Sequence, residues 1–112
     1  MVALPDVGQG EVWWAQLPAP TGPGPGCTRP VVVVQGRIGT VVCIPLTSNL
    51  KWAEAPGNVL LGARATGLPK ASVANASQIV ALDRVVLTSR VGKLAPKRLA
   101  EILSGIDIVL GR

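Results

Sequence analysis

The 112-residue chain contains no histidine and only six carboxylate side chains. Without histidine, mechanisms that need an imidazole base, a Ser–His dyad or a histidine metal ligand are excluded. No two carboxylates fall three or four residues apart, the spacing that would place them on one helix face. Zinc or magnesium held by protein side chains alone is therefore not expected. A Gly-rich phosphate loop and a dinucleotide-binding fingerprint are also absent, so we expect no cofactor.

Long apolar runs and a basic leader are missing as well. The longest charge-free apolar run, at residues 41–46, is far shorter than the roughly 20 residues that a membrane helix needs. No basic region opens the chain, so a secretory signal is not expected. Two cysteines, Cys27 and Cys43, are too few for a disulfide scaffold and predict reduced thiols. We therefore expect a cytoplasmic protein with no membrane partner.

The composition predicts one folded domain. Hydrophobic residues make up 48% of the chain and charged residues 15%, with a mean hydropathy of +0.44. A disordered chain would be poor in apolar residues and rich in charge, so it is excluded. At about 100–200 residues per domain, the length fits a single domain over residues 1–112.

Basic residues gather in the second half of the chain. Eleven Lys and Arg oppose six Asp and Glu, so the formal net charge is +5. Residues 1–56 carry three bases and three acids, whereas residues 57–112 carry eight bases and three acids. Such an excess attracts polyanions, nucleic acid first and an acidic protein partner second. A merely solvated basic face is the alternative.

Most of the predicted elements are short strands. Apolar runs bounded by Gly and Pro predict strands at 11–17, 31–35 (opened by Pro30), 40–46 and 58–61. Residues 72–82 predict one long strand or two collinear strands, and the Pro- and Gly-rich segment 18–26 predicts a loop. Residues 31–34 and 41–44 are apolar on both faces of their strands. One face is expected to pack on the core and the other on a helix or a second subunit.

A helix is predicted from Ala95 to the end of the chain. Pro96 suits its first turn and Gly111 its end. Apolar residues fall on one helical stripe, formed by Leu99, Ile102, Leu103, Ile106 and Leu110. Short strands, Gly/Pro turns and one terminal amphipathic helix predict a small barrel that is mainly β, of the β or α+β class.

Two polar positions next to the predicted strands are candidates for a phosphate site. Arg29 precedes one strand, and Thr47 with Ser48 follows the next. A four-residue turn at 36–39 joins these strands, so they are expected to be antiparallel neighbours, with Arg29 close to Thr47 at one barrel edge. A guanidinium and a hydroxyl suit a phosphate. Taken singly, Arg29 also fits a surface ion pair, and Thr47 a turn cap.

The three tryptophans are the only aromatic residues. Trp13 and Trp14 are successive strand residues and point to opposite faces, so one belongs to the core and the other is free to face a groove or partner. Trp52, in a polar loop beside Lys51, is the candidate for stacking on a nucleobase.

The order of several motifs resembles a known family. The motifs are GEVWW (10–14), TRPVVVV (28–34), VCIPLTS (42–48), GLPK (67–70), SQI (77–79) and VGKL (91–94). They resemble those of the MazF/PemK toxin endoribonucleases, from about residue 8 to the C-terminus. The resemblance implies an SH3-like barrel of the CcdB/PemK type, a homodimer and a MazE-like acidic antitoxin partner. It also implies metal-independent cleavage of single-stranded RNA that leaves a 2′,3′-cyclic phosphate and a 5′-hydroxyl.

The resemblance also implies roles for particular residues. The family's catalytic arginine and threonine fall on Arg29 and Thr47. The 2′-hydroxyl of the substrate is the nucleophile, Arg29 stabilises the charge that develops and is a candidate proton donor to the leaving oxygen, and Thr47 hydrogen-bonds the phosphate. Arginine is a poor general base because its pKa is so high. The implied RNA-binding residues are Thr28, Ser48, Asn49, Trp52, Ser77 and Gln78.

The chain departs from the family pattern at two acidic positions. Many relatives carry an acid where this chain has Gly24, and another where it has Ser77. The sequence therefore does not identify the proton acceptor, and Glu11, at the start of a strand, is expected to be structural. The missing acids keep a second hypothesis open: a non-catalytic barrel that binds RNA or poisons a protein such as DNA gyrase, as the similar CcdB toxins do.

Overall fold

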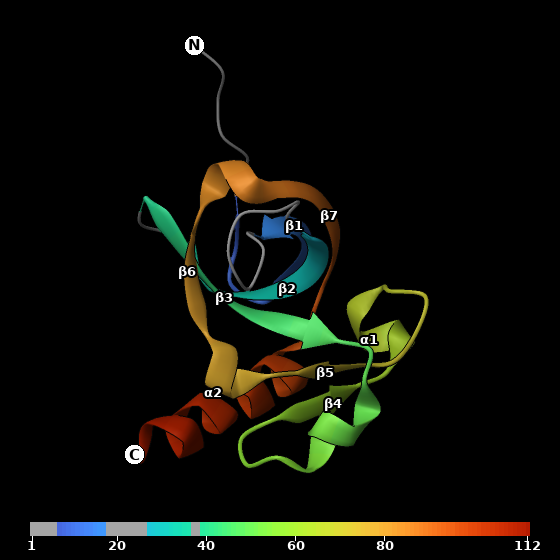
Figure 1. Cartoon of the computed structure of the whole chain (residues 1–112), viewed down its shortest axis with the longest axis vertical. Helices are drawn as coiled ribbons and strands as arrows, with labels where there is room; N and C mark the ends of the chain where they lie inside the picture. Colours follow the sequence, from blue (N-terminus) through green and yellow to red (C-terminus); the bar gives the residue numbers. More distant parts are fainter. Residues whose placement is uncertain (1–6, 18–26, 37–38) are drawn as a thin grey trace.

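Seven strands in the described part of the chain form a barrel with a small sheet attached (Figure 1). The computed structural model describes residues 7–17, 27–36 and 39–112. The predicted loop at 18–26 and part of the predicted turn at 36–39 lie outside these residues. The strands are β1 (Glu11–Leu17), β2 (Cys27–Gln35), β3 (Thr40–Thr47), β4 (Val59–Leu61), β5 (Ser72–Ala74), β6 (Val80–Asp83) and β7 (Leu87–Lys93). Strands β4 and β5 form the small sheet, and all strand pairs are antiparallel.

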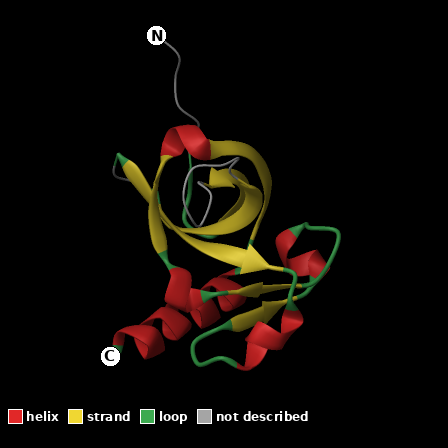
Figure 2. Ribbon diagram, in the orientation of Figure 1, coloured by secondary structure: helices red, strands yellow, loops and turns green. Residues whose placement is uncertain are grey.

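Helical segments connect and cover the strands (Figure 2). The α-helices in the described residues are α1 (Ala63–Thr66) and α2 (Pro96–Leu110). Short 3-10 turns are η1 (Leu50–Glu54), η2 (Ala76–Gln78) and η3 (Arg84–Val86). Helix α2 packs against β4 and η2, which places it on the small sheet rather than on the far end of the barrel. The expected mainly β barrel with a C-terminal helix is confirmed.

Strand β3 belongs to both parts of the fold. It pairs with β6 up to Cys43, opposite Val80, and its end pairs with β5, where Leu46 lies opposite Ala74. Strands β5 and β6 thus follow one another along β3, so residues 72–82 form two strands rather than one. Between the Cys43–Val80 pair and the Leu46–Ala74 pair, β3 has two residues, whereas the segment that joins β5 to β6 has five residues. The excess residues loop out of the sheet as η2, which helps to form the site described below.

Two strands, β2 and β7, differ most from the prediction. Strand β2 begins at Cys27, before Pro30, because Thr28 and Cys27 continue the pairing with Gln16 and Leu17 of β1. Strand β7 was missed altogether, since its central residues are polar and exposed and give no apolar alternation. Its pairing with β1, a non-local interaction, fixes it as a strand.

Both apolar faces of β2 and β3 are covered within this one chain. Val31 belongs to a core cluster inside the barrel, whereas its neighbour Val32 belongs to a second cluster with Ile102 and Ile106 of α2. Each such burial stabilises the fold by about 1.5–3 kcal/mol. The sequence predicted that a helix or a second subunit packs on the second face of these strands. In the structure, helix α2 packs there, so these strands give no evidence for a second subunit.

The predicted helix is confirmed with one correction to its apolar stripe. Pro96 occupies its first turn, and Gly111 ends it with φ +75°. Leu110, expected on the buried stripe, is 59% exposed because the last turn of α2 projects beyond the small sheet (Figure 1). None of the helices in the described residues is long and apolar enough to cross a membrane.

Gly57 and Gly105 let the turn before β4 lie directly on α2. Gly57 has φ +84°, and a Cβ built on it would lie 2.6 Å from the carbonyl oxygen of Gly105. A Cβ on Gly105 would in turn collide with the carbonyl oxygen of Gly57. The two backbones therefore touch, and this contact sets the depth at which α2 packs.

Glu11 joins three segments at the start of β1. Its carboxylate accepts hydrogen bonds from the Gly8 backbone N–H at 2.9 Å and the Trp13 indole at 3.1 Å, and pairs with Arg90 Nε of β7 at 3.1 Å. Burial by itself raises the pKa of this carboxylate, but the hydrogen bonds and the Arg90 charge together hold its pKa below the ordinary value. The expected structural role of Glu11 is confirmed.

Gly105→Ala should lower the free energy of unfolding by about 1–3 kcal/mol, although alanine favours a helix over glycine by about 1 kcal/mol. The added methyl group meets the backbone of the turn at Gly57, which has no side chain to rotate away. Ser104→Ala, at the adjacent exposed position of α2, is the matched control and should be neutral or slightly stabilising. Chemical denaturation measures both variants. A Gly105→Ala protein as stable as the parent would contradict the close packing.

Glu11→Gln should lower the free energy of unfolding at pH 7 by about 1–2 kcal/mol, because its hydrogen bonds are to a charged acceptor. The carboxylate stabilises the fold fully above its unfolded pKa of about 4.3, and this stabilisation is lost as the pH falls through the lower folded pKa. Denaturant titrations between about pH 7 and pH 3 should therefore show the difference from the parent shrinking below about pH 4. A difference that stays constant with pH would show that the charge of Glu11 is unimportant.

Candidate active site

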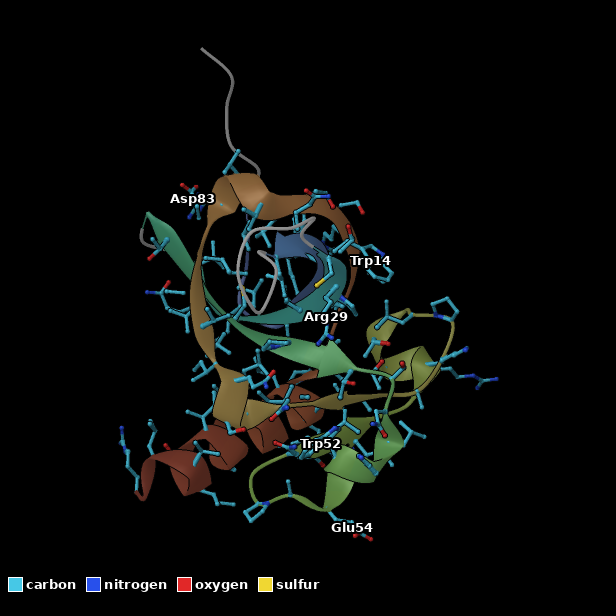
Figure 3. All side chains as sticks on the ribbon, in the orientation of Figure 1. Trp14, Arg29, Trp52, Glu54 and Asp83 are labelled. Atoms are coloured by element: carbon cyan, nitrogen blue, oxygen red, sulfur yellow. The ribbon has the colours of Figure 1, made fainter. Side chains whose placement is uncertain are left out.

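Arg29 and Thr47 meet where β2 begins and β3 ends. The pairing of β2 with β3 ends with Val31 opposite Pro45, two residues after Arg29 on β2 and two residues before Thr47 on β3. Both residues line two hollows of about 340 Å³ and 560 Å³, here called the first and second hollow. Figure 3 shows Arg29 between the barrel and the small sheet, with Trp14 above it and Trp52 below it in this view. The structure thus brings the two residues together, as the strand order predicted.

The first hollow has apolar and hydroxyl walls around one lysine. Besides Arg29 and Thr47, it is lined by Trp14, Thr28, Pro30, Leu46, Ser48, Leu68, Pro69, Lys70 and Ser72. Trp13 is 7% exposed in the barrel core, whereas Trp14 is half-buried at the hollow. The sequence left open which of the two faces a groove, and the structure shows that it is Trp14.

The second hollow is rich in amide side chains. Besides Arg29 and Thr47, it is lined by Pro45, Asn49, Trp52, Ala55, Asn75, Ser77 and Gln78. The Trp52 side chain is 46% exposed, and the Lys51 ammonium lies 5.6 Å from the centre of its ring. Such a cation–π contact holds the ring in a polar loop while leaving its surface accessible. All eight site residues expected from the sequence therefore line one or both hollows.

The Thr47 hydroxyl is also a turn cap. Its oxygen accepts a hydrogen bond from the Asn49 backbone N–H at 3.2 Å, and the Asn49 side-chain oxygen accepts from the Lys51 N–H at 3.3 Å. The capping role that the sequence allowed for Thr47 is therefore real. Because the hydroxyl is the acceptor in this bond, its own proton is left to donate to a ligand at the hollow.

Positive charge dominates the two hollows. Their described lining residues include Arg29 and Lys70 but no carboxylate. Neither Arg29 nor Lys70 makes an ion pair within the described residues. The N–H groups of an exposed guanidinium that has no carboxylate partner can donate hydrogen bonds to an anion such as a phosphate.

Neither of the two positions at which many MazF/PemK relatives carry an acid, Gly24 and Ser77, has a carboxylate in this chain. The Ser77 hydroxyl donates to the Asn75 side-chain oxygen at 2.9 Å, and Gly24 lies outside the described residues. Glu11 is bound to Arg90 and lines neither hollow. Across residues 7–17, 27–36 and 39–112, no three His, Cys, Asp or Glu side chains gather into a metal-binding group.

Sequence reasoning assigned no role to several residues at the hollows. Leu68, Pro69 and Lys70 were noted as a motif, and they reach the first hollow after a turn at Gly67, which has φ +85°. Asn75 reaches the second hollow because its N–H bonds the Pro45 carbonyl oxygen at 3.1 Å. These placements depend on which strands pair, and no local pattern in the sequence could have given them.

Proteins named endoribonucleases are similar to nearly the whole chain. Endoribonuclease MazF2 of Mycobacterium bovis is 39% identical over 110 residues, which covers 93% of this chain and 96% of that protein. Endoribonuclease EndoA of Bacillus subtilis is 28% identical over 109 residues, covering 93% and 94%.

Solved structures show the same fold. The crystal structure of MazF from Deinococcus radiodurans has a TM-score of 0.75 at 25% identity, over 99% of this chain and 100% of that one. A MazE–MazF crystal structure from the same organism has a TM-score of 0.74 at 25% identity, over 98% of each chain. The family model described as "PemK-like, MazF-like toxin of type II toxin-antitoxin system" matches residues 8–110. The chain therefore belongs to the PemK-like, MazF-like family of type II toxins.

Proposed function

We propose that this protein is a toxin endoribonuclease that cleaves single-stranded RNA, mRNA above all, at short sequences and without a metal ion. The relatives named endoribonucleases support the reaction class. The observation that carries the proposal is the position of Arg29 and Thr47, which line both hollows. A phosphate bound between them has one hollow on each side, as a cleavage site within an RNA strand requires.

The reaction proceeds with groups that the substrate itself supplies. The 2′-hydroxyl oxygen attacks the adjacent phosphorus and its proton passes to solvent water. The bond from phosphorus to the 5′-oxygen breaks and that oxygen takes up a proton, which leaves a 2′,3′-cyclic phosphate and a 5′-hydroxyl. Arg29 stabilises the negative charge that grows on the phosphate and is the candidate proton donor to the leaving oxygen. The Thr47 O–H donates to a non-bridging oxygen and orients the phosphate for in-line attack. Because arginine holds its proton so tightly, Arg29 does not act as the base.

The two hollows bind the nucleotides on either side of the phosphate. In the second hollow, Trp52 offers a stacking surface and Asn49, Ser77 and Gln78 offer hydrogen bonds. In the first hollow, Thr28 adjoins Arg29 along the chain, Ser48 adjoins Thr47, and both contact the RNA. Lys70 adds positive charge on that side.

A non-catalytic barrel that binds RNA or a protein target is the second candidate. The observation that favours it is that the described residues lining the hollows include no carboxylate. Without a carboxylate, the proton of the 2′-hydroxyl must go to another acceptor. The experiment on Arg29 below distinguishes the two candidates.

An acidic antitoxin is the proposed protein partner. The Deinococcus radiodurans MazF was crystallised with MazE, and this chain has the same fold. We infer that a MazE-like acidic segment lies over the two hollows, because Arg29, Lys51 and Lys70 provide positive charge there without ion-pair partners among the described residues. An antitoxin at this position excludes RNA from the site.

A homodimer in the cytoplasm completes the proposal. Ile108 and Leu110, in the last turn of α2, are each 59% exposed and leave apolar surface free for a partner subunit. Cys27 and Cys43 are both free thiols, as a reducing compartment allows.

Arg29→Ala should lower the rate of single-stranded RNA cleavage in EDTA by at least about a hundredfold, since removing one charge-stabilising donor typically costs 10²–10³ in rate. Thr47→Val should also lower the rate, by about tenfold or more, whereas Thr47→Ser keeps the hydroxyl and most of the activity. Gel-resolved cleavage of a labelled RNA measures each rate.

Lys93→Ala is the control for charge. It removes the same positive charge from an exposed residue of β7, opposite Glu11 and away from both hollows, and should change the rate by less than about twofold. RNA that stays intact with the wild-type protein at high concentration would favour the binding barrel instead. Cleavage undiminished in Arg29→Ala would remove Arg29 from the mechanism.

The affinity for the cognate antitoxin should fall at least about tenfold between about 50 mM and 500 mM salt, because exposed charges are screened. Lys70→Ala should weaken binding more than Lys93→Ala, since Lys70 lines the first hollow. Calorimetric titration at several salt concentrations gives both comparisons. An affinity insensitive to salt would argue that the partner does not recognise the basic hollows.

A further inference from the structure

Asn58 forms a side-chain bridge behind the second hollow. Its amide nitrogen donates to the Trp52 carbonyl oxygen at 2.9 Å, and its amide oxygen accepts from the Ala76 N–H at 3.0 Å. The residue is half-buried just before β4 and does not itself line the second hollow. One planar amide therefore joins two turns, η1 and η2, that belong to distant parts of the sequence.

Both joined turns carry residues that line the second hollow. Turn η1 carries Trp52 and is capped by Asn49, whereas η2 carries Ser77 and Gln78. The N–H of Asn75 fixes η2 to β3 through the Pro45 carbonyl oxygen at 3.1 Å. Turn η1 follows the end of β3 and is attached to η2 through Asn58. Turn η1 also packs on β5 and β4, and the Asn58 bridge ties it directly to η2, so the bridge helps to set the relative position of the two turns.

The walls present the groups that read a nucleobase. Trp52 supplies an aromatic face that is accessible at 46% exposure. Gln78 is exposed, and its side-chain amide has no hydrogen-bond partner within the described residues. A ring on one turn and an amide on the other match the face and the edge of a base. How well a given base fits depends on the separation of the two walls.

We propose that Asn58 is a positioning residue for sequence selectivity: by tying the Trp52 turn to the Ser77–Gln78 turn, it sets the width of the pocket that reads the base next to the cleaved phosphate. This inference rests on the proposed RNA cleavage. Asn58 acts through the walls, so its loss should change which RNA is preferred more than it changes the chemical step. A purely structural role would instead lower stability and affect all substrates alike.

The test compares Asn58→Ala, which loses both hydrogen bonds, with Asn58→Asp, which keeps the acceptor for the Ala76 N–H and loses the donor to Trp52. Gln9→Ala is the matched control, because Gln9 also donates to a backbone carbonyl, that of Val34 at 3.0 Å, near the other end of β2. A random single-stranded RNA pool cut by the wild-type protein defines a preferred oligonucleotide. A second oligonucleotide differs from it in one base beside the cut.

Asn58→Ala should reduce the preferred-to-changed ratio of kcat/KM by at least about tenfold, mainly through a higher KM on the preferred RNA. Its kcat on the preferred RNA and its kcat/KM on the changed RNA should stay within about threefold of the wild-type values. Asn58→Asp should fall between Asn58→Ala and the wild type, and Gln9→Ala should match the wild type. If Asn58→Ala fails to fold, the ratio for Asn58→Asp decides. An unchanged ratio, or an equal loss of kcat on both oligonucleotides, would overturn the proposal.

A failure of the proposed function itself gives a different result. If the wild-type protein leaves the RNA pool uncut, the endoribonuclease proposal fails. Oligonucleotides enriched from the same pool by binding then replace the cleaved ones, and the ratio of their Kd values is compared between the wild type and Asn58→Ala. A ratio that falls about tenfold supports the role of Asn58 in reading the base, and an unchanged ratio excludes it.

Discussion

The pairing of β2 with β3 is the constraint on which the site depends. Val31 opposite Pro45 brings together the strand ends that carry Arg29 and Thr47, where β3 leaves the barrel and joins the small sheet, and both residues line the same hollows. Strand β3 pairs with β6 in the barrel and with β5 beyond it, and its last residue, Thr47, lines both hollows. A shift of one residue in this register would turn Arg29 and Thr47 to opposite faces and remove the site.

Three acidic side chains form ion pairs with arginines away from the two hollows. Glu11 binds Arg90, Glu101 binds Arg98, and Asp107 binds Arg112, all outside the two hollows. The cations at the hollows have no such partners within the described residues. Arg29 and Lys70 therefore present uncompensated positive charge at the hollows, where a polyanion is expected to bind, and the proposed catalysis relies on charge stabilisation and orientation.

Local sequence patterns predicted those features that depend on residues close together in the sequence. Pro96, the apolar stripe and Gly111 gave α2, and the Arg29–Thr47 adjacency followed from a short turn between two apolar strands. Strand β7, the looping out of η2 and the direction of Trp14 were not predicted, because each depends on pairing with a distant strand. The Asn58 bridge joins residues 18 positions apart and could not be seen in the sequence for the same reason.

The central claim is that a guanidinium and a hydroxyl at the end of β3 act on a phosphate that the ribose itself attacks. The most direct measurement is the chemistry of the RNA ends after cleavage in EDTA, by mass spectrometry, for an RNA and its copy with one 2′-deoxy nucleotide at the cut. We expect 2′,3′-cyclic phosphate and 5′-hydroxyl ends from the first and no cleavage of the second. Ends with a 3′-hydroxyl and a 5′-phosphate, or cleavage of the deoxy copy, would contradict the claim.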